Sequence, residues 1–148
     1  MKILLAIDDS QFSENAIQAV IAQARGQETD VQLLHVVDLL PITPLDGYWA
    51  TIPDLDSLRK EQAKRGEELV ARAAEKLRAA GLKVAARVEE GDPKSKILDL
   101  AAEWKVDLVV VGSHGRTGLD RFLLGSVSEG VARHAHCSVL IVRGAGRR

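Results

Sequence analysis

The residues of this chain best suited to chemistry form a glycine-rich loop that ends at Ser126. Glycines stand at positions 112, 115, 118 and 125. The apolar run Leu108 to Val111 precedes them and is typical of a buried strand. Glycine lets a backbone approach a phosphate closely and adopt positive φ angles. A helix beginning at Ser126 would add unpaired N–H groups and the positive end of its dipole. A strand, a glycine loop and a helix start in this order predict an anion site.

The spacing of these glycines differs from the two commonest nucleotide-binding motifs. A GxGxxG fingerprint would need glycine at position 114, where the chain has histidine, and a Walker A loop would need a lysine before its final serine or threonine. The pattern is instead Gly-x2-Gly-x9-Gly-Ser, formed by Gly112, Gly115, Gly125 and Ser126. It predicts a phosphate loop of a different class.

Length and composition indicate one folded domain without a general attraction to polyanions. The 148 residues are 46% hydrophobic and 28% charged, with a formal net charge of −1. We therefore expect neither nucleic acid nor a membrane as a partner. No signal segment precedes the first apolar run, and the single cysteine, Cys137, is interpreted as a core residue of a reducing compartment. These features predict a cytoplasmic protein with a domain over 1–143 and a short basic tail over 144–148.

Apolar strand patterns alternate with helical patterns along the chain. Strands are expected at 3–7, 31–37, 82–88, 108–111 and 138–142, and helices at 10–24, 55–80, 93–104 and 126–135. Ser10 is the expected cap of the first helix, and Asp92 with Pro93 is expected to start the third. The segment 38–54 contains three prolines and a glycine, which predicts a loop.

Strands that alternate with helices predict an α/β fold with a parallel sheet covered on both faces. The runs 108–111 and 139–142 lack alternating polar residues, as strands buried on both faces do. Ligands of such sheets bind beyond the carboxyl ends of the strands. The segments 8–10, 36–38 and 112–126 are therefore expected to meet at one site.

These segments resemble the universal stress protein family over nearly the whole chain. The matching stretches are 3–8, 34–36, 90–93, 111–115, 125–127 and 137–142, and the glycine spacing is similar to the ATP-binding signature of the family. The resemblance implies a single doubly wound, Rossmann-like domain with a five-stranded parallel sheet in the order 3-2-1-4-5. It also implies ATP as the ligand, with or without Mg²⁺, and a homodimer.

The resemblance also implies roles for individual residues. Asp8 looks like the acid that accepts hydrogen bonds from ribose, and Val36 like the residue whose backbone meets adenine. Gly112 and Gly115 are similar to the glycines that face ribose and phosphate. The full implied nucleotide-binding set is Ala6, Asp8, Val36, Gly112, Ser113, His114, Gly115, Arg116, Gly125, Ser126, Val127 and Ser128.

Several polar residues have a structural interpretation beside the functional one. We favour a ligand role for Asp8 and a helix-capping role for Asp9. His35 is predicted to be a hydrogen-bonded strand histidine, whereas His114 fits phosphate contact and solvent exposure equally well. Near the last helix, His134 and His136 are expected to interact with the carbonyl end of the helix rather than to bind a metal.

Two further pairs lie in the predicted loops. Arg116 and Arg121 flank the glycines and could neutralise phosphate, although a solvated arginine is the simpler interpretation of each. Tyr48 and Trp49 could cover a ligand, cover a second subunit or anchor the loop, and the sequence does not rank these roles.

The leading functional hypothesis is an ATP-binding stress-response regulator whose nucleotide occupancy controls its conformation or an unidentified protein partner. No general base with an orienting partner is evident, which leaves at most slow ATP hydrolysis or self-phosphorylation. A phosphoacceptor receiver domain is the first alternative. Asp8 and Asp9 are compatible with the Mg²⁺ site of a receiver. However, a receiver needs an aspartate after the third strand, where this chain has Glu89-Glu90, and a Lys-Pro pair after the fifth strand, where it has Arg143-Gly144. A small adenylating enzyme is the second, and it would need another substrate pocket.

The expected homodimer uses the fifth strand. In the order 3-2-1-4-5 this strand lies at an edge, yet the run 139–142 is apolar on both faces. An exposed apolar edge favours pairing with another chain, and a twofold axis would pair the strand with its own copy.

Overall fold

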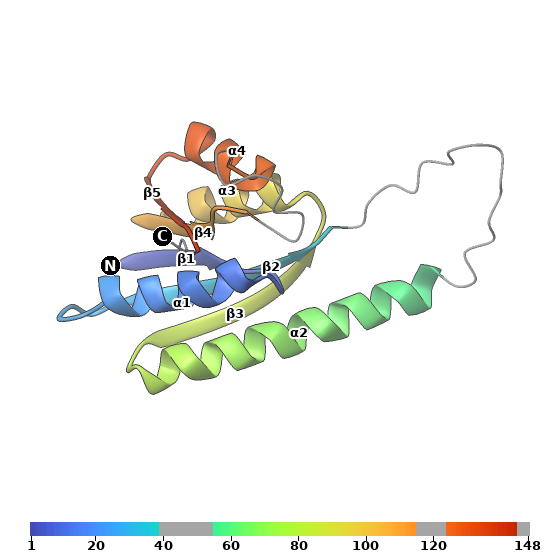
Figure 1. Cartoon of the computed structure of the whole chain (residues 1–148), viewed down its shortest axis with the longest axis horizontal. Coiled ribbons are helices and arrows are strands. Elements are labelled where there is room, and N and C mark those ends of the chain that lie inside the picture. Colours follow the sequence, from blue (N-terminus) through green and yellow to red (C-terminus); the bar gives the residue numbers. More distant parts are fainter. Residues whose placement is uncertain (39–54, 115–123, 145–148) are drawn as a thin grey trace.

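A five-stranded parallel sheet lies between two layers of helices in the computed structural model, which describes residues 1–38, 55–114 and 124–144 (Figure 1). The strand order is β3-β2-β1-β4-β5, so the predicted doubly wound α/β fold is confirmed. The strands are β1 (Lys2–Ala6), β2 (Asp30–Val37), β3 (Lys83–Glu90), β4 (Leu108–Gly112) and β5 (Ser138–Val142). The helices are α1 (Gln11–Gln23), α2 (Leu55–Ala79), α3 (Pro93–Trp104) and α4 (Ser126–His134).

The two faces of the sheet carry separate apolar cores. Helices α1 and α2 cover one face, and α3 and α4 cover the other (Figure 1). In β1, for example, Leu5 belongs to the first core and Leu4 to the second, and both are fully buried. Burial on both faces explains why the central strands have unbroken apolar sequences.

The start of α3 is formed as the sequence predicted. The Asp92 carboxylate accepts a hydrogen bond of 3.0 Å from the Ser95 main-chain N–H, and Pro93 occupies the first turn, where it displaces no helical bond. The hydrogen bond from the Ser95 hydroxyl, followed by the one from the Ser95 main-chain N–H, lowers the pKa of Asp92 below its usual value. Helix α3 ends at Lys105, which has a left-handed backbone with φ of 54°.

The start of α1 lacks the hydrogen bond of a serine cap. Ser10 occupies the capping position, as predicted, but its side chain makes no capping hydrogen bond. Instead, Oδ1 of Asp8 accepts a hydrogen bond of 2.8 Å from the main-chain N–H of Ser10. The aspartate before the helix therefore satisfies a main-chain donor at this turn.

The other element boundaries agree with the sequence to within one residue, apart from the end of β3, which lies two residues later than predicted. That strand continues to Glu90 because it pairs with β2 as far as Val37. In the described residues, no helix has the length and apolar character needed to cross a membrane. The predicted loop beyond Asp38 with Tyr48 and Trp49, the residues Gly115, Arg116 and Arg121, and the end of the basic tail lie outside the described residues.

Candidate functional site

The carboxyl ends of β1 and β4 lie next to each other at the point where the strand order reverses. The chain moves from β1 outward to β2 and β3, then returns to β4 on the other side of β1. Ligands of open α/β sheets bind at this switch point. Asp8 follows β1, and β4 ends at Gly112 with Ser113 and His114 after it. The predicted convergence of these two segments is thus present in the fold.

The two ends of the glycine loop are joined directly to each other. The Gly125 N–H donates a hydrogen bond of 2.8 Å to the Ser113 carbonyl. The Ser128 hydroxyl lies 3.0 Å from the same carbonyl and 3.0 Å from that of Gly125. A side chain at Gly125 would put its first carbon 3.2 Å from the Ser113 oxygen and 3.3 Å from His114 Cα. Glycine at position 125 is therefore needed for close approach, and it places the start of α4 beside the end of β4.

This arrangement leaves the first main-chain donors of α4 without a side-chain cap. Gly125 is the capping residue and has no side chain to accept from them. The N–H groups of Ser126, Val127 and Ser128 are the ones that an α-helix cannot satisfy internally. Together with the helix dipole, they make the start of α4 suitable for an anion.

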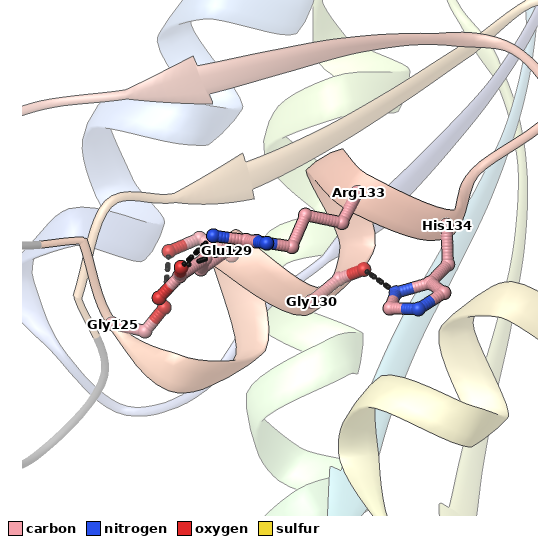
Figure 2. Close-up of polar contacts among 6 residues, drawn as sticks. Gly125, Glu129, Gly130, Arg133 and His134 are labelled. Carbon is pink, nitrogen blue, oxygen red and sulfur yellow. Dashed lines mark hydrogen bonds and ion pairs between the residues drawn. The ribbon is translucent and has the colours of Figure 1, made fainter.

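An acidic residue in the first turn of α4 is held by a partner one turn further along. Figure 2 shows Gly125 at the start of the helix and the Glu129 carboxylate beside the Arg133 guanidinium, with an N···O distance of 2.9 Å. The guanidinium offsets a negative charge that would otherwise oppose an anion at this helix start.

Asp8 has a fixed orientation at the end of β1. Its Oδ1 accepts from the Ser10 N–H at 2.8 Å and from the Ser13 hydroxyl at 3.0 Å, while its own N–H donates to Ser13 Oγ. Asp8 thus supports the start of α1, the role that the sequence suggested for Asp9. A carboxylate offers about four acceptor positions, so Asp8 retains capacity for a ligand.

Two polar atoms near these segments are buried without a hydrogen-bond partner. They are Ser10 Oγ and His114 Nε2, which find none in the described parts of the chain. The His114 ring is held by Ser113 Oγ, 3.2 Å from Nδ1, and by the Phe12 ring, whose centroid lies 5.5 Å away. Buried polar atoms without partners are uncommon in folded proteins. A polar ligand at this edge of the sheet would supply the missing partners.

The main chain of Val36 faces the space beyond the end of β1. Successive strand residues direct their main-chain groups alternately to the two neighbouring strands. The Leu34 carbonyl accepts from Ile7 on the β1 side, and the Val37 carbonyl accepts from Gly91 on the β3 side. The N–H and C=O of Val36 therefore point to the β1 side, where β1 has already ended at Ala6. Ala6 and Val36 both pack against the core under α3 and α4.

His35 and His134 have structural partners. His35 Nδ1 lies 2.8 Å from the Ile7 carbonyl, which confirms the prediction of a hydrogen-bonded strand histidine. His134 Nδ1 lies 2.9 Å from the Gly130 carbonyl in the last turn of α4, as expected of a histidine at a helix end (Figure 2). Within the described residues, no group of three potential ligand side chains could hold a metal ion.

Sequence reasoning missed the contributions of Phe12, Ser13 and Val142. Phe12 lies over Gly112, where an added methyl group would come within 2.8 Å of the Phe12 Cβ. The Val142 carbonyl accepts a hydrogen bond of 2.8 Å from the Ser113 N–H. The glycine at position 112 was the one available signal, because it indicated that something approaches the backbone there.

Comparisons with known proteins agree with this geometry. The universal stress protein family matches residues 1–143. The chain is 37% identical to universal stress protein MJ0531 of Methanocaldococcus jannaschii, over 96% of this chain and 81% of the relative. The structure of hypothetical protein MJ0577 superposes with a TM-score of 0.86 at 29% identity, over 98% of this chain and 96% of that chain.

A second solved structure contains a nucleotide. It is a universal stress protein in complex with cAMP, with a TM-score of 0.67 and 25% identity over 96% of this chain and 95% of that chain. The sequence match to the family spans residues 1–143 and so covers the glycine spacing and the strand ends around it. The chain belongs to the universal stress protein family.

Proposed function

We propose that this protein is an adenine-nucleotide-binding regulator of a stress response, with ATP as its ligand. In this proposal, nucleotide occupancy changes the conformation of the protein or its association with a protein partner. The observation that carries the proposal is the closed glycine loop, which brings the uncapped start of α4 to the end of β4. The cAMP complex of a related protein supports the same ligand class.

The phosphates would bind at the start of α4. The main-chain N–H groups of Ser126 and Val127 supply donors there, and the dipole of α4 favours negative charge. Gly112, Ser113, Gly115 and Arg116 belong to the same proposed site. Ser128 has a supporting role, because its single hydroxyl proton serves main-chain carbonyls and its side chain is 2% exposed.

The nucleoside would lie across the ends of β1 and β2. Asp8 would accept hydrogen bonds from the ribose hydroxyls, and the main chain of Val36 would pair with the adenine edge. His114 Nε2 and Ser10 Oγ would find polar partners on the ligand. Where Mg²⁺ accompanies ATP, the Asp8 carboxylate suits an ion that keeps several waters and takes one or two protein carboxylates.

The proposed role is binding rather than fast catalysis. Ser113 contacts His114, but its side chain is 2% exposed and therefore a poor nucleophile. Slow hydrolysis or self-phosphorylation is compatible with the site. Cys137 is a free cysteine, and burial raises the pKa of its thiol. As part of the proposal we place the protein in the cytoplasm, since a single cysteine cannot form an internal disulfide.

We also propose that the protein is a homodimer formed through β5. Among the described residues this strand pairs with β4 alone, at one edge of the sheet, and its residues from Val139 to Val142 are half-buried in the single chain. Pairing with a second β5 would satisfy its open edge and cover this apolar surface.

Substitution of Ser126 by proline tests the nucleotide site. Proline lacks an N–H but suits the first position of a helix, and Gly125 already has the extended backbone, φ −63° and ψ 156°, that proline requires before it. Losing a donor to an anion should weaken ATP binding about tenfold or more. Ser126→Ala, which keeps the N–H, is the control. Calorimetry that finds equal ATP affinity in wild type and a folded Ser126→Pro variant contradicts this site.

A further inference from the structure

A lysine of α3 lies against the second turn of α4. A methyl group at Gly130 would overlap Cδ of Lys94, and it would stand 3.0 Å from Cγ and 3.7 Å from Cε. The aliphatic stem of Lys94 therefore occupies the place that any other residue at position 130 would fill. Glycine inside a helix is less favourable than alanine. The protein thus has a weak helix former where the lysine stem crosses α4.

The stem of this side chain lies near the start of α4. Gly130 lies four residues after Ser126, which is about 6 Å along a helix axis. Side-chain positions on a helix also lean toward its N-terminus. The stem of Lys94 therefore crosses α4 about one turn from the first N–H groups of that helix.

Lys94 is exposed and interacts weakly with Asp92. The pKa of Asp92 is lowered first by the Ser95 hydrogen bonds and, to a smaller extent, by the charge of Lys94. Ion pairs between exposed groups are weak and exchange easily. A polyphosphate concentrates more negative charge than one carboxylate and would attract the ammonium more strongly.

Lys96 is a matched lysine on the same helix that points elsewhere. Its Nζ lies 4.0 Å from Glu89, and its stem packs beside Gly91 at the end of β3. The two lysines share the first turns of α3 and the same charge, although Lys94 is exposed and Lys96 is half-buried. Their stems contact different neighbours. Comparing the Lys94 and Lys96 variants therefore separates a local charge effect at the site from a general effect of losing one positive charge.

We propose that Lys94 contacts the outer phosphates of the bound nucleotide and makes the site prefer ATP over AMP. This inference rests on the proposed function and adds to it a residue that determines the preferred phosphate number. The short phosphate of AMP would remain at the start of α4, and the longer chain of ATP would extend toward the ammonium. Selectivity would then arise from α3 as well as from the glycine loop.

The test compares ATP and AMP affinities by calorimetry for wild type, Lys94→Met and Lys96→Met. Methionine keeps an unbranched stem on Gly130 and removes the charge. Lys94→Met should weaken ATP about fivefold and AMP by less than about twofold, the size expected for one exposed charge–charge contact. Lys94→Arg should retain the preference for ATP, and Lys96→Met should leave both affinities unchanged. The ATP loss should shrink as salt is raised.

The outcomes separate the two proposals. If wild type binds neither nucleotide, both the proposed function and the role of Lys94 are wrong. If wild type binds ATP but Lys94→Met weakens ATP and AMP equally, or weakens neither, only the role of Lys94 is overturned. A loss of the same size in Lys96→Met would also overturn it, because general charge would then explain the effect.

Discussion

Gly125 and Ser113 are hydrogen-bonded across the glycine loop, with 2.8 Å between the Gly125 nitrogen and the Ser113 oxygen. This bond fixes where α4 begins relative to β4. Ser128 reinforces this bond, because its hydroxyl contacts the carbonyl oxygens of Ser113 and Gly125. The proposed phosphate site therefore depends on a closed loop as much as on the glycines within it.

Removing the Ser128 hydroxyl should loosen this closure. Ser128→Ala deletes a buried hydrogen bond and should lower the free energy of unfolding by about 1 kcal/mol. ATP affinity should fall with it, although Ser128 is not expected to touch the phosphates. Ser126→Ala, at an exposed position of the same helix, should change stability by less than about 0.5 kcal/mol. Urea unfolding gives both values, and equal stability in the two variants would contradict the closure argument.

Asp8→Ala should weaken ATP and also disturb the start of α1. A charge-assisted hydrogen bond to ribose is worth about 1.5–3 kcal/mol, or roughly ten- to hundredfold in affinity. Asp8→Asn retains acceptors for Ser10 and Ser13, so it should preserve more stability than alanine. Calorimetry and thermal unfolding separate the two effects. If Asp9→Ala weakens ATP and Asp8→Ala does not, the ligand roles of this pair are reversed.

The cap of α3 should give a pH-dependent contribution to stability. The pKa of Asp92 is lowered by its hydrogen bonds to Ser95, so the folded state favours the ionised carboxylate. This stabilisation is complete above the unfolded-state pKa and is lost as pH falls through the lower folded-state pKa. Asp92→Ala should cost about 1 kcal/mol at pH 7, and the difference from wild type should narrow on acidification toward pH 3. If urea unfolding gives the same stability difference between wild type and Asp92→Ala over this pH range, the ionised cap is ruled out.

Lys105→Gly should stabilise the protein. Lys105 has φ of 54° and ψ of 58° at the end of α3, and the following N–H of Val106 donates to the Ala101 carbonyl. Glycine adopts this left-handed conformation without the side-chain penalty, so a gain of about 1 kcal/mol is expected. Ala102→Gly, at an exposed position inside the same helix, should cost about the same amount. The midpoint of thermal unfolding should rise in Lys105→Gly and fall in Ala102→Gly.

The β5 dimer can be tested with a proline that spares the sheet. The Val142 carbonyl accepts from Ser113 on the β4 side, so the main chain of the preceding residue, Ile141, points to the open edge. Ile141→Pro therefore removes an N–H needed for pairing with a second chain but none from the β4 ladder. Light scattering should report a dimer for wild type and for Ile141→Ala, and a monomer for a folded Ile141→Pro. A wild-type mass of one chain at tens of micromolar would exclude the dimer.

The sequence determined the fold because its signals are local and repeated. Unbroken apolar runs such as Val109 to Val111 mark strands buried on both faces, and their alternation with helical patterns permits few arrangements other than a parallel sheet. Pro93 after Asp92 indicated a helix start, and the structure has the capping hydrogen bond of Asp92 at that position. The convergence of Asp8 with the glycine loop followed from the rule that parallel strands end at one edge.

Only the tertiary structure decided how the polar groups at that edge are partnered. The sequence could not show that Asp8, rather than Ser10, bonds the first turn of α1, because both are good acceptors two residues apart. It also could not place the stem of Lys94 on Gly130, since those residues lie on different helices whose packing depends on the whole sheet. Periodicity and turn chemistry act within a few residues along the chain, whereas these contacts depend on how separate elements pack, and the folded structure alone specifies that.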